Sequence, residues 1–167
     1  NQTYTLHERE TYSSDWVTAQ NNGTIVDTAI CSEYKFFNDE KAIAYLKLSG
    51  DVTELCVYSF ADGTAKKIAT DVTEFSIQDN NTVLYISDGN LHSLTYKGHT
   101  DFTTKLVTEY VYEVKTAHDY GYTDSNDYFY TTIKLEYINQ NMYYNAGELH
   151  YVKSGNDTKI GDNASNI

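Results

Sequence analysis

Apolar and polar residues alternate through the stretch Thr82–Gly98, TVLYISDGNLHSLTYKG, on both sides of an Asp-Gly pair. A period of two, in runs rich in Val, Ile, Leu and Tyr, is typical of β-strands. An Asp-Gly pair tolerates the positive φ angles that a two-residue hairpin turn requires. The pattern therefore predicts a β-hairpin that turns at Asp88-Gly89.

The same hairpin pattern recurs at residues 140–155, QNMYYNAGELHYVKSG, and in part at residues 45–60. Aligning Gly89 with Gly147 gives the sequence Gly-x-Leu-His in both copies, and this alignment predicts that the later hairpin turns at Ala146-Gly147. The two aligned histidines would lie in separate repeats. We therefore interpret them as structural residues rather than as one shared metal site.

Further strand-like segments follow the hairpins, so the repeating unit has about four short strands over roughly 40 residues, a period typical of propeller blades. We expect an all-β single domain of antiparallel, four-stranded repeats at about residues 33–76, 77–115 and 133–167. Three repeats are fewer than a closed propeller contains. The prediction is therefore an incomplete propeller or, alternatively, a β-sandwich, with edge strands available for self-association.

The composition agrees with a β-protein, because 17 of the 167 residues are Tyr and none is Pro. The net charge of −12 argues against nucleic acid and against an anionic membrane surface as partners, since both attract clustered Lys and Arg. No apolar run in the sequence is long enough to cross a membrane, so we expect no membrane insertion by this segment. The abrupt polar ends lead us to expect a fragment of a longer chain.

The spacing between repeats predicts an insertion at residues 116–132, TAHDYGYTDSNDYFYTT, on a loop or an extended hairpin. Its tyrosines would form an aromatic platform for a glycan or a protein at the cell surface. They are Tyr120, Tyr122, Tyr128 and Tyr130. Alternation places the last two on one face of a strand, where packing against neighbouring strands is the alternative role.

Acidic residues on the same insertion offer the hard oxygen ligands that Ca²⁺ prefers. They are Asp119, Asp124 and Asp127, together with Asn126. Their spacing differs from that of a calcium-binding EF-hand loop, and a solvated acidic turn is the alternative. We expect no other cofactor.

Two cysteines, Cys31 and Cys56, each lie in an apolar, strand-like run. They would form a disulfide if their two strands were neighbours. The alternative is that both are small, buried apolar residues.

A recurrent order of short motifs runs through the repeats: Asp71-Val72-Thr73 with Phe75, Leu84-Tyr85-Ile86, Asp88-Gly89, Leu91, Leu94 and Thr104-Lys105-Leu106. This order resembles the repeats of uncharacterised, extracytoplasmic, propeller-like proteins of Gram-positive bacteria. The resemblance covers about residues 33–114 and, in part, 137–160. It implies export, propeller-like blades and a binding or scaffold role, and it supplies no catalytic residues.

These features favour a non-enzymatic, extracytoplasmic binding or scaffold module that mediates protein interaction through the insertion. One alternative is a carbohydrate-binding module that uses the Tyr-rich surface. The other is a hydrolase with an acidic site that the sequence does not reveal. The sequence has no Ser-His-Asp order, no glycine-rich phosphate loop and no Cys/His cluster.

Overall fold

The computed structural model describes residues 4–8, 24–99, 101–164 and 167 of the chain. Antiparallel strands make up nearly all of its secondary structure, and the only helix in these residues is a single 3₁₀ turn, η1 (Ala117–Tyr120). In the same residues, no helix is both long enough and apolar enough to span a membrane. The chain divides into two compact units, residues 1–70 and 71–167.

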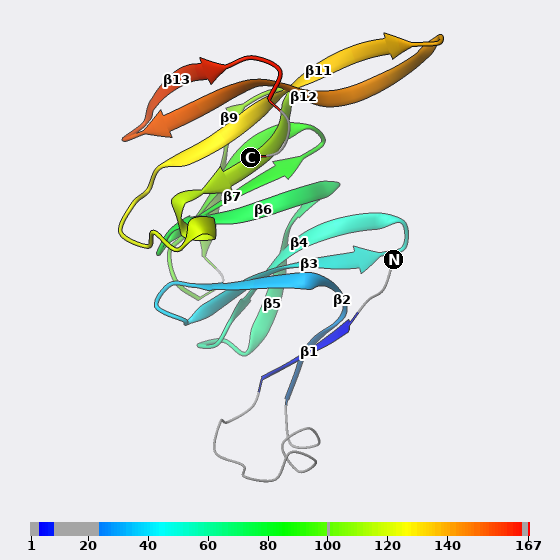
Figure 1. The fold of residues 1–167 in the computed structure, drawn as a ribbon. Helices are drawn as coiled ribbons and strands as arrows, with labels where there is room; N and C mark the ends of the chain where they lie inside the picture. Colours follow the sequence, from blue (N-terminus) through cyan, green and yellow to red (C-terminus); the bar gives the residue numbers. More distant parts are fainter. Residues whose placement is uncertain (1–3, 9–23, 100, 165–166) are drawn as a thin grey trace. The chain divides into compact units, whose positions relative to one another are not determined.

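The first unit contains one five-stranded antiparallel sheet whose strands follow chain order (Figure 1). These strands are β1 (Tyr4–Glu8), β2 (Thr24–Phe37), β3 (Ala42–Ser49), β4 (Val52–Ser59) and β5 (Thr64–Thr70). One face of the sheet packs a cluster that includes Ile30, Tyr45 and Cys56. The Tyr45 hydroxyl donates a hydrogen bond to Asp27 (2.8 Å), which also forms a 2.6 Å ion pair with Lys47. Burial raises the pKa of Asp27, but these hydrogen bonds outweigh it and the net shift is downward.

The second unit contains two four-stranded antiparallel sheets, again in chain order. Counting β1–β5 as the first sheet of the chain, the second sheet consists of β6 (Val72–Asp79), β7 (Thr82–Ser87), β8 (Asn90–Tyr96) and β9 (Phe102–Thr108). The third sheet consists of β10 (Val111–Thr116), β11 (Tyr128–Ile138), β12 (Asn141–Lys153) and β13 (Asn156–Gly161), with η1 between β10 and β11. The predicted hairpin turn at Asp88-Gly89 is confirmed, because both residues have positive φ angles (48° and 71°).

A buried apolar cluster joins the two sheets of the second unit. Its members come from both sheets: Leu84, Ile86, Leu91, Val111, Val114, Tyr128, Tyr130 and Val152. Buried hydroxyls add to this contact, since Thr116 Oγ1 donates to the Ile77 carbonyl (2.6 Å) and lies 2.8 Å from Ser76 Oγ. Period-two alternation explains why one set of side chains on each strand faces this cluster.

The strand registers show a threefold structural repeat, formed by β2–β5, β6–β9 and β10–β13. In each group, a Tyr of the second strand pairs with the residue after a Leu of the third strand: Tyr45 with Cys56, Tyr85 with His92, and Tyr130 with His150. The pairing of the third and fourth strands slips at this same point in all three groups. The alignment of Leu91-His92 with Leu149-His150 is therefore confirmed by the register.

The limits of the sheets differ from the repeat boundaries that the sequence suggested. The predicted boundary between residues 76 and 77 lies inside β6, because that strand pairs with β7 rather than with β5. The third sheet begins at Val111, ahead of the predicted insertion at 116–132. Short alternating strands look alike in sequence, whereas backbone pairing decides which sheet each strand joins.

The predicted turn at Ala146-Gly147 is wrong. Both residues lie inside β12, and the hairpin instead turns at Asn139 and Gln140, whose φ angles are 50° and 65°. The φ angles of these two residues suit a two-residue hairpin turn. The aligned glycine keeps its place before the Leu-His pair, but the chain there continues along the strand.

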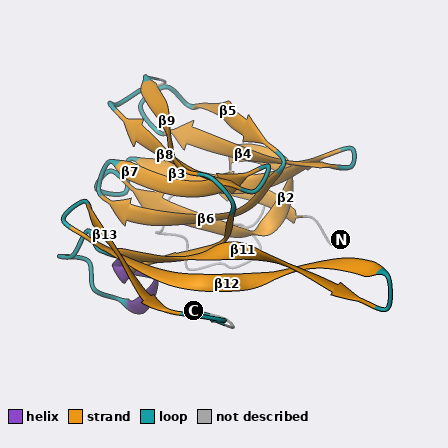
Figure 2. Ribbon diagram, turned by 90° about the horizontal axis from the view of Figure 1, so that it is seen from above, coloured by secondary structure: helices purple, strands orange, loops and turns teal. Residues whose placement is uncertain are grey.

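The hairpin of the third sheet is consequently much longer than that of the second. Seven positions separate the paired Tyr85 and His92, whereas twenty separate the paired Tyr130 and His150. Most of the extra length in this repeat therefore lies in the β11–β12 hairpin. Figure 2 shows the far end of that hairpin extending beyond the other strands of its sheet.

Candidate functional site

The extended part of the β11–β12 hairpin, Ile133–Ala146, is a two-stranded ribbon that we call the arm. The pairing of β10 with β11 ends at Thr132, and the pairing of β13 with β12 begins at Leu149. The Ile133 N–H, at the base of the arm, donates to the Tyr110 carbonyl (2.7 Å). Beyond it, β11 and β12 pair only with each other, and both outer strand edges lack a strand partner among the described residues. An isolated two-stranded hairpin is only marginally stable, so the sheet at its base supports the arm.

The register divides the arm into two faces. Residues on one face are apolar or aromatic: Ile133, Leu135, Tyr137, Met142, Tyr144 and Ala146. Residues on the opposite face are mostly polar: Lys134, Glu136, Ile138, Asn141, Tyr143 and Asn145. We call the first set the apolar face and the second set the polar face.

Four side chains of the apolar face are exposed, at 52% for Leu135, 75% for Tyr137, 45% for Met142 and 57% for Tyr144. Ile133, at the base, is half-buried, and its Cδ1 lies 3.3 Å from where a Cβ on Gly89 would be. The apolar face is thus continuous with the packed side of its sheet. Contiguous exposed apolar surface of this kind is typical of protein interaction sites.

Charges on the polar face neutralise each other. Lys134 Nζ lies 2.9 Å from Glu136 and donates to the Asn163 side chain at 2.7 Å. Asn145 also donates to Glu136 (2.7 Å). The hydrogen bonds from Lys134 and Asn145 lower the pKa of Glu136, so its carboxylate stays ionised beside Lys134. The arm therefore presents no unbalanced charge to a partner.

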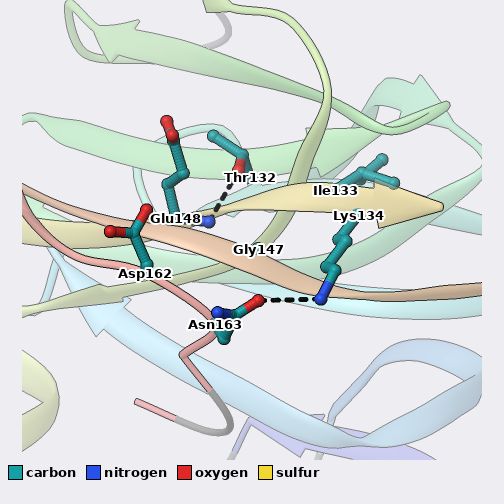
Figure 3. Close-up of a pocket in the computed structure, with 7 residues that line it drawn as sticks. All are labelled: Thr132, Ile133, Lys134, Gly147, Glu148, Asp162 and Asn163. Carbon is teal, nitrogen blue, oxygen red and sulfur yellow. Dashed lines mark hydrogen bonds between the residues drawn. The ribbon is translucent and has the colours of Figure 1, made fainter. Parts of the chain in front are cut away.

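A pocket of about 350 Å³ lies at the base of the arm, where the pairing of β11 with β12 slips between Thr131 and Ile133 (Figure 3). Its lining residues come from β11, β12 and the segment after β13: Thr132, Ile133, Lys134, Gly147, Glu148, Asp162 and Asn163. Thr132 Oγ1 accepts a hydrogen bond from the Glu148 backbone N–H (2.9 Å). This side-chain bond satisfies a backbone donor that the irregular pairing would otherwise leave open.

Gly147→Ala is expected to lower the free energy of unfolding by about 1–3 kcal/mol. A Cβ at Gly147 would lie 2.8 Å from Thr132 Oγ1 and 3.3 Å from Lys134 Cβ, so the strands must separate to admit it. Gly161→Ala is the matched control, because its Cβ would meet only Leu149 Cβ at an ordinary 3.8 Å. Urea unfolding of both variants measures the effect, and equal losses would contradict this steric explanation.

The carboxylates of this pocket do not form an acid–base pair. Lys159 Nζ lies between Glu148 and Asp162, at 2.6 Å from each. Hydrogen bonds from Lys159 and His150 lower the pKa of Glu148. A glycoside hydrolase needs one carboxyl group to remain protonated, and the lowered pKa of Glu148 opposes that role.

The four tyrosines that the sequence singled out do not share one surface. Tyr120, the last residue of η1, and Tyr122, two residues further on, are both exposed. Tyr128 and Tyr130 do lie on one face of a strand, as the alternation predicts, but that face is the buried side of the sheet. Tyr128 and Tyr130 therefore have the alternative role, packing against neighbouring strands in the core.

The three aspartates of the calcium hypothesis lie in different surroundings. Asp119 accepts hydrogen bonds from the Thr116 backbone N–H (2.9 Å) and from the Ser76 hydroxyl. Asp127 accepts one from the Tyr151 hydroxyl (2.5 Å), whereas Asp124 is exposed. Across the described ranges, no three His, Cys, Asp or Glu side chains gather closely enough to hold a metal ion.

Cys31 and Cys56 are both free thiols in the structure. The condition for a disulfide is not met, because β3 lies between β2, which carries Cys31, and β4, which carries Cys56. Strands two apart in a sheet are about 9–10 Å apart, beyond the Cα separation that a disulfide spans. Burial raises the pKa of the Cys56 thiol to about 11.

The aligned histidines have structural contacts, as expected. His92 stacks on Tyr85 with ring centroids 5.2 Å apart, and His150 stacks on Tyr130 at 4.7 Å. In the third sheet, Asp157 also accepts a hydrogen bond from Tyr130 (2.5 Å) and lies 2.8 Å from His150 Nδ1. Each histidine thus stacks on the tyrosine with which it pairs across the second and third strands of its own sheet.

Sequence reasoning missed the arm. The signal was present in Asn139-Gln140-Asn141, a polar run between two alternating segments that is typical of a hairpin turn. The alignment of the two glycines hid this signal, because it assigned the turn to Ala146-Gly147.

Comparisons with known structures address the fold. The β-propeller domain of the Trilobed protease from Pyrococcus furiosus, described as having an open velcro topology, is similar with a TM-score of 0.51 and 13% identity. The match covers 97% of this chain and 54% of that one, so this chain spans about half the length of its structural neighbour. An acylaminoacyl peptidase from Pyrococcus horikoshii has a TM-score of 0.49 and 12% identity, over 98% of this chain and 31% of that one.

The similarity to a propeller domain, together with the four-stranded antiparallel sheets, confirms the predicted all-β, propeller-like fold. No protein-family model matches the sequence, and comparison with curated proteins finds no match.

Proposed function

We propose that this chain is a non-enzymatic binding module whose arm inserts into an apolar surface of a partner protein. The observation that carries this proposal is the apolar face, where Leu135, Tyr137, Met142 and Tyr144 are all exposed on a ribbon projecting from its sheet. Large apolar and aromatic side chains are the residues that dominate binding energy at protein interfaces. The extracytoplasmic location implied by the resemblance is part of this proposal.

A protein fits this face better than a glycan does. Leu135 and Met142 have no group that could replace the hydrogen bonds that sugar hydroxyls make with water, so covering them with sugar would cost free energy. The unpaired edges of the arm additionally suit hydrogen bonding to a strand of a partner protein. With Lys134 and Glu136 paired, the interaction is expected to depend little on salt.

The matched pair Tyr143 and Tyr144 tests the proposal. The two residues are adjacent and similarly exposed (47% and 57%), but they lie on opposite faces of the arm. A photo-crosslinking residue at Leu135 is expected to capture a partner protein from cell-surface material, and the affinity for the captured protein is then measured. Tyr144→Ala should weaken that affinity by about tenfold or more, and Tyr143→Ala by much less.

An armless chain provides the second control. In the second sheet, the four residues Ser87–Asn90 connect the paired Ile86 and Leu91, which are equivalent to Thr131 and Leu149. Replacing residues 132–148 by Ser-Asp-Gly-Asn should therefore leave a folded chain that no longer binds. Equal losses from Tyr143→Ala and Tyr144→Ala would contradict the proposal. Glycan binding that requires Tyr120 and Tyr122 would instead favour the carbohydrate alternative.

A further inference from the structure

Two hydrogen bonds mark the junction between the two sheets of the second unit. The Val111 backbone N–H donates to the Gly89 carbonyl (2.8 Å), and the Val114 backbone N–H donates to the Glu74 carboxylate (3.0 Å). Both donors lie on β10, the first strand of the third sheet, and both acceptors lie on the second sheet. These bonds seat the first strand of one sheet against the preceding sheet.

The same two bonds recur on the far side of the third sheet. The Ala164 N–H donates to the Gly147 carbonyl (2.9 Å), and the Ile167 N–H donates to the Glu113 carboxylate (3.2 Å). By register, Gly147 is equivalent to Gly89 and Glu113 to Glu74, since each glutamate pairs with an equivalent residue of the second strand.

The donors are equivalent as well. Thr108 and Gly161 hold the same place, opposite the Leu of the third strand. Val111 and Val114 lie three and six residues after Thr108. Ala164 and Ile167 lie three and six residues after Gly161. The backbone agrees, because Tyr110 and Asn163, one residue before the first donors, have φ angles of 58° and 52°.

The face of the third sheet that carries Phe129, Thr131 and Leu149 resembles a buried face in composition, but it is only partly covered. Its equivalents on the second sheet, Leu84, Ile86 and Leu91, are at most 1% exposed. On the third sheet the corresponding positions hold Phe129, Thr131 and Leu149, and both apolar residues are only half-buried. Phe129 stacks on Tyr151 at 4.7 Å, and buried Thr131 Oγ1 has no hydrogen-bond partner among the described residues.

We infer that this face, Phe129, Leu149 and Tyr151 with Glu113 at its margin, is a docking surface for one further four-stranded antiparallel sheet. In the first strand of that sheet, Ala164 and Ile167 occupy the positions that Val111 and Val114 occupy in β10. The occupant is thus a blade of the same kind as β6–β9 and β10–β13, because the repeated bonds place its first strand on the face.

An extended chain tests this inference. Because Ile167 is equivalent to Phe75 and Val114, appending residues 76–108 after Ile167 supplies the remainder of a blade in register. In the 167-residue chain, Leu149→Ala should lower the melting temperature by only a few degrees. In the extended chain, the same substitution should lower it about threefold more, approaching the effect of Leu91→Ala, because Leu149 becomes fully covered.

The matched control carries one additional Ser between Ile167 and the appended residues. A one-residue shift turns every appended side chain to the opposite face, so this chain should show only the small effect of Leu149→Ala. A second extension, with residues 115–161 in the same register, covers the case in which the first appended sequence fails to fold. The inference is overturned if neither extension increases the effect of Leu149→Ala. It is also overturned if light scattering shows that the 167-residue chain is a dimer and that Leu149→Asp separates it into monomers.

Discussion

Leu91→Ala is expected to lower the free energy of unfolding by about 3–5 kcal/mol. Leu91 is fully buried in the cluster that joins the two sheets of the second unit, so the substitution leaves a cavity that the surrounding side chains cannot fill. Leu149→Ala, at the equivalent position of the third sheet, should cost only about 1 kcal/mol, because that side chain is half-buried.

Chemical denaturation of both variants, followed by circular dichroism, measures this difference. The two substitutions remove the same atoms at the same place in the repeat, so strand propensity cancels in the comparison. Similar losses would mean that Leu149 is as well covered as Leu91, and that the far face of the third sheet is not a free surface.

Glu74→Ala is expected to lower the free energy of unfolding by about 2–3 kcal/mol, somewhat less than the effect of removing one partner from a fully buried ion pair. The Glu74 side chain is 20% exposed, and its carboxylate accepts hydrogen bonds from both the Val114 backbone and Lys115. Burial lowers the pKa of Lys115, the ion pair with Glu74 raises it, and the net shift is upward. Removing Glu74 would leave a partly buried lysine and a backbone N–H without their acceptor.

Glu113→Ala is the matched control for Glu74→Ala, since Glu113 holds the equivalent position and accepts a hydrogen bond from Ile167. It should cost about 1 kcal/mol or less, the usual net value of one hydrogen bond. The free energy of unfolding of Glu74→Gln should fall between those of the two alanine variants. An amide oxygen still accepts a hydrogen bond from the Val114 N–H, but it does not neutralise Lys115. A larger loss for Glu113→Ala than for Glu74→Ala would contradict this account.

The tyrosines of β11 and of the arm separate what alternation predicts from what it does not. Tyr128 and Tyr130 were placed correctly on one face of a strand, because alternation is a local property. Whether that face meets solvent depends on β6–β9, which packs against it from a distant part of the sequence. The exposed tyrosines of the arm, Tyr137 and Tyr144, show the same alternation and have no such cover.

The sequence by itself determined the strands, the turn at Asp88-Gly89 and the repeated Leu-His pair, because side-chain period and turn chemistry act over a few residues. Only the tertiary structure decided the rest. It placed Gly147 within a strand at the base of the arm, and it buried Leu91 while leaving Leu149 half-covered. Equivalent positions of a repeat adopt the same local structure, but burial depends on which sheet packs against them, and that contact joins residues far apart in the chain.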